Sequence, residues 1–261
     1  FKIVKYNDNK NVEIQFLKTG YETVVQLVHI KNGDVKDRYL PSVCGIGTVG
    51  TKYLSRINGV LIKEYGLWQN MLRRCYSDSS KKKRPTYEGC EVSDNFLHYE
   101  YFYEWCHKQV GFDNEGWQLD KDLLVKGNKV YGESTCIFIP SEINLVLVKC
   151  TASRGKHLIG VHWSNTNKAF VAKVSKNKGE QEWLGSFNTE IEAFNTYKTA
   201  KESYIKEQAE KYKSQIDVRA YKASISLLEA SGDRAGKWHH CSVSHTSKLF
   251  ISNILLNLSQ G

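Results

Sequence analysis

The segment from residue 159 to residue 207 constrains the fold of this chain more than any other part of the sequence. It contains three short runs in which apolar and polar residues alternate, separated by polar turns. This period of two is typical of strands, so the segment predicts a three-stranded sheet. A helix should follow, because Thr189 and Glu192 have the spacing of a capping box. The apolar stripe that would lie on the sheet consists of Ala193, Phe194, Tyr197, Ala200 and Tyr204.

The charge of the chain favours a polyanionic partner. There are 37 Lys and Arg residues against 28 Asp and Glu residues, which gives a formal net charge of +9. Nucleic acid is the commonest partner for such an excess, although many basic proteins never bind DNA. The length of 261 residues favours more than one small domain.

Neither a membrane segment nor an export signal is visible. No run of about 18 apolar residues occurs, and no charged segment leads into an apolar one at the start. We expect a cytoplasmic protein without a membrane partner; its oligomeric state is not indicated. Phe1 in place of Met suggests that the true start has been removed or lies upstream. The seven cysteines form no CxxC pair, which favours free thiols. The irregular spacing also disfavours a zinc site built from Cys75, Cys90, Cys106 and His107.

The N-terminal region predicts a small β unit. Residues 1–30 alternate in short runs separated by NDNK and KTG, a pattern typical of antiparallel strands. Residues 43–53 contain three glycines without the strand and helix that a phosphate-binding loop requires. We therefore interpret this stretch as a flexible linker.

The next region is expected to be mainly helical. One amphipathic helix is predicted by the spacing of Tyr65, Trp68, Met71, Leu72 and Cys75, with Arg73 and Arg74 pointing away from the apolar face. Residues 77–89 are rich in Ser and Lys and predict an exposed loop. A second helix should begin at Asp94 as N-cap. Its aromatic residues favour a core over a platform for stacking bases; they are Phe96, Tyr99, Phe102, Tyr103 and Trp105.

Residues 117–149 have the order short strand, loop, short strand, and helix beginning near Ser141. Asp120 ends the first strand, Asn128 lies in the loop, and Asn144 lies on the helix. Carboxylate and amide oxygens suit Mg²⁺ or another divalent cation, which can neutralise the charge that builds up during phosphodiester hydrolysis. Asp120 and Asn144 are therefore candidate metal ligands, and Asn128 can hold the loop by bonding its backbone. The alternative is that LDKD and GNK are only a turn and a loop.

Together with the run YxxWxxMLxRCY at 65–76, this segment resembles phage proteins of the HNH and AP2 type, related to homing endonucleases. The HNH motif runs Asp-His, then Asn, then Asn or His, and the matching residues here are Asp120, Lys121, Asn128 and Asn144. The resemblance covers most of residues 1–220. It implies a phage double-stranded DNA-binding protein in a bacterial host cell. That protein is either a metal-dependent endonuclease or a non-catalytic relative that keeps the fold.

Lys121 departs from the family pattern, because histidine normally stands there to deprotonate the attacking water. An unperturbed lysine titrates at about 10.4, so roughly one molecule in two thousand carries the free amine at neutral pH. The neighbouring Asp120 and Asp122 favour the charged ammonium further. We therefore expect Lys121 to bind phosphate and not to activate water.

Residues 159–207 resemble the AP2 domain, in which a three-stranded sheet backed by a helix contacts the DNA major groove. The resemblance implies that exposed strand residues contact phosphates and base edges. The matching residues and those on the approach are Arg154, Lys156, His162, Trp163, Lys168, Lys173 and Trp183. Arginine is scarce among them, so we expect modest sequence specificity. For each tryptophan, a core position is an equal alternative.

The sequence as a whole predicts an α+β protein. We expect a small β unit with linker at 1–53, an HNH-like domain at 54–150, an AP2-like domain at 151–221 and an atypical tail at 222–261. The tail contains His239, His240, Cys241 and His245 without the spacing of a closed metal site. RNA is a third candidate partner, but no aromatic strand motif of the RNP type supports it.

Overall fold

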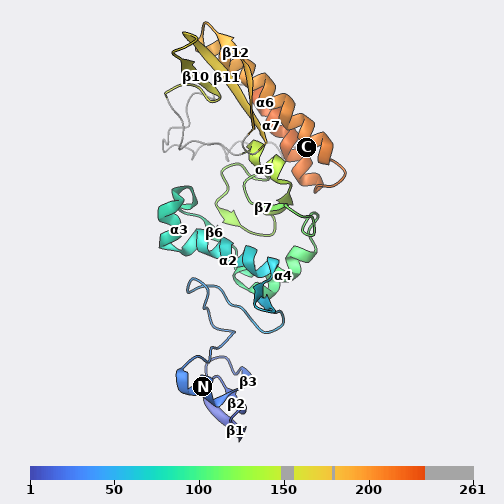
Figure 1. The fold of residues 1–261 in the computed structure, drawn as a ribbon. Coiled ribbons are helices and arrows are strands. Elements are labelled where there is room, and N and C mark those ends of the chain that lie inside the picture. Colours follow the sequence, from blue (N-terminus) through green and yellow to red (C-terminus); the bar gives the residue numbers. More distant parts are fainter. Residues whose placement is uncertain (148–155, 178–179, 233–261) are drawn as a thin grey trace, which may run out of the picture.

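The computed structural model describes residues 1–147, 156–177 and 180–232, and in this part of the chain small separate sheets are interspersed with helices (Figure 1). The fold is α+β, as predicted. The N-terminal strands lie at one end, and the helices α2 (Lys63–Tyr76) and α4 (Tyr99–His107) lie in the middle (Figure 1). The sheet that contains β11 (Ala169–Asn177) lies with α6 (Glu190–Tyr212) at the other end (Figure 1).

The N-terminal unit is an antiparallel sheet in the order β1-β2-β3, followed by a short helix. Its elements are β1 (Lys2–Asp8), β2 (Asn11–Gln15), β3 (Glu22–Val25) and α1 (Leu27–Asn32). The central strand buries Val12 and Ile14, two residues apart, because alternate side chains of a strand point to the same face. The predicted antiparallel β unit is confirmed.

The middle of the chain is built around two helices and their aromatic side chains. Its elements are β4 (Arg56–Ile57), β5 (Val60–Leu61), α2 (Lys63–Tyr76), α3 (Asp78–Lys83), η1 (Pro85–Tyr87), β6 (Glu91–Val92), η2 (Asn95–Leu97) and α4 (Tyr99–His107). The rings of Phe96 and Phe102 meet edge to face with centroids 5.1 Å apart. The indole N–H of Trp68 donates to the carbonyl oxygen of Phe96 at 2.7 Å. The predicted amphipathic helix and aromatic core are both confirmed.

Several local expectations in this region are wrong. Residues 77–89 contain α3 and η1 and are not a loop throughout. Asp94 makes no side-chain cap; a 3-10 turn follows it, and α4 begins only at Tyr99. Arg74, predicted to point away from the apolar face of α2, lies with its guanidinium over the ring of Tyr87, 5.5 Å from the centroid. The face of the Tyr87 ring attracts the guanidinium and replaces part of the water that would otherwise surround it.

The predicted linker at 43–53 is also wrong, because this stretch packs on the aromatic core. The backbone N–H of Thr48 donates to the Leu97 carbonyl, and the N–H of Tyr99 donates to the Thr48 carbonyl, both at 2.9 Å. Gly47 lies directly against Trp68 and Leu72, with no room for a side chain. The glycine thus allows close backbone approach to α2.

The segment after α4 forms a hairpin with a helix. Its elements are β7 (Gln118–Asp120), β8 (Val130–Tyr131), β9 (Ile137–Ile139) and α5 (Ser141–Leu147). β7 pairs antiparallel with β9, whereas β8 pairs parallel with β6. One face of the hairpin packs on the aromatic core through Leu119 and Phe138. The other face buries Ile137 and Ile139 in a second core. The predicted order of strand, loop, strand and helix is confirmed, with the helix beginning at Ser141.

The C-terminal part contains the predicted antiparallel sheet in the order β10-β11-β12, backed by α6. Its elements are β10 (Val161–Ser164), β11 (Ala169–Asn177), β12 (Glu180–Phe187), α6 (Glu190–Tyr212) and α7 (Val218–Gly232). The capping box is confirmed: Thr189 accepts from the Glu192 N–H at 3.3 Å, and the Glu192 carboxylate accepts from the Thr189 N–H at 3.2 Å.

The sequence places the start of an atypical tail at residue 222, and residues 222–232 continue α7. Ile216 and Ala220 join the core that contains Ile137 and Ile139. Ala220 of α7 is thus buried against β9, which precedes the C-terminal sheet in the sequence. Residues His239, His240, Cys241 and His245 lie outside the described residues. Within the described residues, no helix is long and apolar enough to cross a bilayer.

If residues 43–53 are part of the core, Gly47→Ala should destabilise the protein. The added methyl would collide with Trp68 and Leu72, and overpacking of this kind costs about 1–3 kcal/mol. Gly66→Ala, inside α2 with ordinary contact distances, is the control and should be neutral or stabilising. Urea unfolding midpoints measure both. A Gly47→Ala midpoint equal to that of the wild type would show that this stretch is a loose connection.

Candidate nucleic-acid interface

Asp120 ends β7 and closes the turn that follows it. Its Oδ2 accepts hydrogen bonds from the backbone N–H of Asp122 at 2.8 Å and of Leu123 at 2.7 Å. Burial raises the pKa of Asp120, and the two backbone hydrogen bonds offset part of this effect. Its strand partner is Ile137, so the carboxylate lies on the side of the second core. The main role of the Asp120 carboxylate is therefore to hold the backbone of the turn that follows β7.

Lys121 follows the end of β7, and its side chain lies on the side of the aromatic core, away from the second core. Its side chain is only 7% exposed, and its Nζ donates to Asp122 Oδ1 at 2.5 Å and to the Asn128 carbonyl at 3.0 Å. The ring centroid of Tyr131, which belongs to the aromatic core, is 5.6 Å from Nζ. The Lys121 side chain therefore serves as a hydrogen-bond donor to the loop that follows β7.

Asn128 holds the loop between β7 and β8. Its side-chain amide donates to the carbonyl oxygens of Lys121 at 2.8 Å and Val130 at 2.6 Å, and its Oδ1 accepts from the Val130 N–H at 3.1 Å. This is the loop-holding geometry that the sequence predicts for Asn128. The side chain is thereby occupied with backbone groups.

Asn144 lies on α5, and its amide donates to Gln118 Oε1 at 2.6 Å. Gln118 and Asp120 share a face of β7, because they are two residues apart. Asn144 and Asp120 therefore lie on the α5 side of the hairpin, whereas Lys121 and Asn128 interact on its other side. The four residues matched to the HNH motif do not converge on one centre.

The donor set on the α5 side does not fit a divalent cation well. One Asp120 oxygen already accepts two backbone N–H groups, and the other candidate ligand is a single amide. Mg²⁺ requires near-octahedral oxygen coordination, normally with at least one carboxylate available to it. Among the described residues, no group of three or more His, Cys, Asp and Glu could hold a metal. The disfavoured zinc candidates Cys75, Cys90 and Cys106 are buried in the aromatic core.

The register of the C-terminal sheet assigns each strand residue to a face. Val161 pairs with Ala172, and Trp163 pairs with Phe170. Val161, Ala172 and Phe170 pack with Ala193 and Phe194 of α6, so this is the covered face. Residues that alternate with these lie on the other face, which we call the open face. It is formed by His162, Val171, Lys173, Trp183 and Ser186.

The open face presents a lysine beside an exposed tryptophan. Lys173 and Trp183 are direct cross-strand partners, and Trp183 is 60% exposed. His162 and Ser186 are exposed as well, whereas Lys173 is half-buried and Val171 is buried. Asn167, in the turn before β11, donates to Ser186 Oγ at 3.3 Å. The open face thus combines one cation, one aromatic ring and several hydrogen-bonding groups.

The other predicted DNA-contacting residues are distributed around the sheet. Trp163 lies on the covered face, 42% exposed, with its ring edge-on to Phe170 at 5.0 Å. Lys168 is exposed in the turn between β10 and β11, where its φ is 47°. Lys156 is exposed before β10. Arg154 lies outside the described residues.

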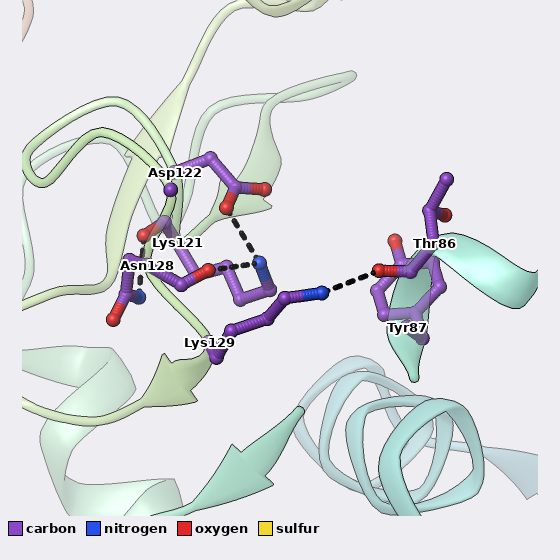
Figure 2. A pocket seen from close by; sticks show the side chains of 7 residues that line it. Thr86, Tyr87, Lys121, Asp122, Asn128 and Lys129 are labelled. Atoms are coloured by element: carbon purple, nitrogen blue, oxygen red, sulfur yellow. Dashed lines mark hydrogen bonds and ion pairs between the residues drawn. The ribbon is translucent and has the colours of Figure 1, made fainter. Parts of the chain in front are cut away.

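A pocket near Lys121 involves residues that the sequence does not single out. It has a volume of about 280 Å³ and is lined by Thr86, Tyr87, Lys121, Asp122, Gly127, Asn128 and Lys129 (Figure 2). Lys129 Nζ donates to the carbonyl oxygens of Thr86 at 3.0 Å and Glu88 at 2.9 Å. The parallel pairing of β6 with β8 brings these distant segments together. Strands of two residues are too short to show an alternating pattern, so the sequence contains no signal for this pairing or for the pocket.

Comparison of the chain with protein families, with curated proteins and with solved structures gives no match. The resemblance to HNH and AP2 proteins therefore stays a prediction from sequence motifs. Inference about function depends on the geometry described above.

Replacing Asp120 with Asn tests whether the carboxylate serves the turn or a metal. Because burial raises the pKa of Asp120, the folded state holds the proton more tightly than the unfolded chain. This group's contribution to stability therefore falls as pH rises from about 3.9 through the folded pKa. Asp120→Asn keeps an oxygen acceptor without the charge, so it should remove this fall and leave the urea midpoint at pH 7 unchanged or higher.

The control is Asp113→Asn at an exposed position, which should leave the pH profile of the urea midpoint as it is in the wild type. Stabilisation of the wild type by millimolar Mg²⁺, absent in Asp120→Asn, would contradict this account. A ligand that binds only the folded state must raise its stability.

Proposed function

We propose that this chain binds double-stranded DNA through the open face of its C-terminal sheet and does not cleave it. The observation that carries the proposal is the cross-strand pair of Lys173 and Trp183 on the face opposite α6. The three strands form an antiparallel sheet backed by one helix, which is compatible with the AP2 architecture that the sequence resembles. A strand-built surface of this kind fits the width of the major groove.

Trp183 is informative because it stands beside a lysine on the open face, and not because of its exposure alone, since single exposed apolar side chains are common at protein surfaces. Trp183 is 60% exposed although it is surrounded by strand residues. Beside it, Lys173 can neutralise a phosphate, and the formal charge of +9 makes the whole chain attractive to a polyanion. Together they support a nucleic-acid surface over a solvated sheet.

The polar groups of the open face support only modest sequence specificity. His162, Asn167 and Ser186 can exchange hydrogen bonds with base edges. Lysine makes point contacts with phosphate more readily than bidentate contacts with guanine, and no described residue of the open face is arginine. We expect phosphate contacts to supply most of the affinity.

Endonuclease activity is the second candidate, and the order of β7, β9 and α5 is the observation that favours it. Two observations support the non-catalytic alternative more strongly. Lys121 is a buried ammonium paired with Asp122, and Asp120 is engaged by the backbone of the following turn. With the matched residues on two sides of the hairpin, Asp120, Lys121, Asn128 and Asn144 do not form one centre that could activate water.

Duplex binding should depend on the open face and on salt. Lys173→Gln should reduce the slope of log K against log salt by about one, since one phosphate contact is lost. Trp183→Ala should weaken binding roughly tenfold, as expected of a central aromatic contact. Trp163→Ala, on the covered face, is the matched control and should change affinity little. Fluorescence anisotropy with labelled duplex DNA and duplex RNA measures these effects.

Affinity that does not respond to salt would contradict DNA binding. Equal losses for Trp163→Ala and Trp183→Ala would contradict the assignment of the open face. Preference for duplex RNA would favour the third candidate partner over DNA.

Plasmid incubated with the protein and Mg²⁺ or Mn²⁺ should remain supercoiled. The physical reason is that Lys121 supplies a charged ammonium where a base is needed. Nicking gained by Lys121→His would attribute the inactivity to this residue. Robust nicking by the wild type that Asp120→Ala abolishes would show the chain to be a nuclease after all. Gel electrophoresis of the plasmid forms provides the measurement.

A further inference from the structure

The pocket beside Lys121 and Lys129 has no part in the open face of the C-terminal sheet or in the α5 side of the hairpin. Its lining comes from η1 and from the loop that connects β7 to β8 (Figure 2). The two lysines approach it from different positions of that loop, and Tyr87 faces them from η1 (Figure 2). The chemistry of these groups indicates what the pocket can hold.

Each lysine ammonium retains one hydrogen-bond donor. An ammonium has three N–H donors. Lys121 gives two of them to Asp122 Oδ1 and the Asn128 carbonyl, and Lys129 gives two to the carbonyls of Thr86 and Glu88. Two lysines that line one pocket therefore have a donor each for a shared acceptor.

The charges around the pocket are unbalanced. Asp122 is the only carboxylate among its lining residues, and its side chain is 60% exposed. Against it stand Lys121, which is 7% exposed, and Lys129. Lys129 is exposed, so Lys121 is the cation of this pair that is removed from water. Burying a cation is costly unless an anion is near, so an anion bound between the two lysines would stabilise this arrangement.

We propose that this pocket binds one phosphate group of a DNA strand. A phosphate supplies several strong acceptors for the two remaining lysine donors and a negative charge for the two lysines. The volume of about 280 Å³ leaves room for a phosphate with its flanking sugar atoms. Gly127 has no neighbour within 4 Å of an added Cβ, so the loop leaves space on this side. The identity of the phosphate source rests on the proposed function, whereas the anion site itself does not.

Inorganic phosphate is the probe for the anion site in the full chain without DNA. Titration followed by two-dimensional amide NMR should give saturable shifts of Gly127 and Asn128. Lys129→Gln should raise the half-saturation concentration at least tenfold, and Lys129→Arg, which keeps the charge, should largely restore it. Lys126→Gln is the matched control, since Lys126 is exposed in the same loop and does not line the pocket. Unchanged signals elsewhere verify that each variant is folded.

Shifts that grow linearly with phosphate, or that sodium chloride of equal ionic strength reproduces, would overturn the proposal. So would a Lys129→Gln response equal to that of Lys126→Gln.

A second arm uses the duplex DNA. Lys129→Gln should reduce the salt slope of duplex binding by about one. If no duplex binds while phosphate still saturates the Gly127 shift, the proposed function fails and the site serves a free phosphate compound. If duplex binding depends on Trp183 but Lys129→Gln matches Lys126→Gln in both arms, the pocket inference fails and the proposed function stands.

Discussion

The one-sided burial of the C-terminal sheet by α6 is the constraint on which the functional account depends. A single helix can cover only one face of a sheet, and here it covers the face of Val161 and Ala172 with Ala193 and Phe194. Strand alternation then commits Lys173 and Trp183 to the other face. The same helix continues beyond the sheet to the region of α7 and α5, which ties the C-terminal sheet to the hairpin (Figure 1). The open face therefore follows directly from how the apolar stripe of α6 is buried.

Strand alternation also determines what the hairpin can do. Asp120 and Lys121 are neighbours in sequence, but their side chains make different contacts. Asp120 accepts hydrogen bonds from the turn beside the second core, whereas Lys121 lies near Tyr131 of the aromatic core. The buried Lys121 side chain is held in place by its ion pair with Asp122. The region is thus better arranged for holding a loop and attracting an anion than for hydrolysis. In this account two separate parts of the chain contribute positive charge toward a nucleic-acid partner.

Much of the fold could be predicted, because its signals are local. The capping box of Thr189 and Glu192, the apolar spacing of α2 and the alternation of the terminal sheets each depend on residues a few positions apart. What could not be predicted depends on distant contacts. Residues 43–53 look like a linker until Gly47 is seen against Trp68. The role of Lys129 as a pocket residue depends on the parallel pairing of β6 with β8, which brings it to Thr86. Asp120, Lys121, Asn128 and Asn144 could be singled out from the sequence, but the placement of their side chains on two sides of the strand could not be predicted.

Photo-crosslinking to duplex DNA that carries 5-bromodeoxyuridine tests the central claim most directly, because it identifies the residue in contact with a base. Trp183 and Trp163 lie on opposite faces of one sheet, so a single complex provides both the test and its internal comparison. The account predicts crosslinks at Trp183, mapped by mass spectrometry, and none at Trp163. Crosslinks concentrated at Trp163 or on the N-terminal sheet, with Trp183 unmodified, would contradict it.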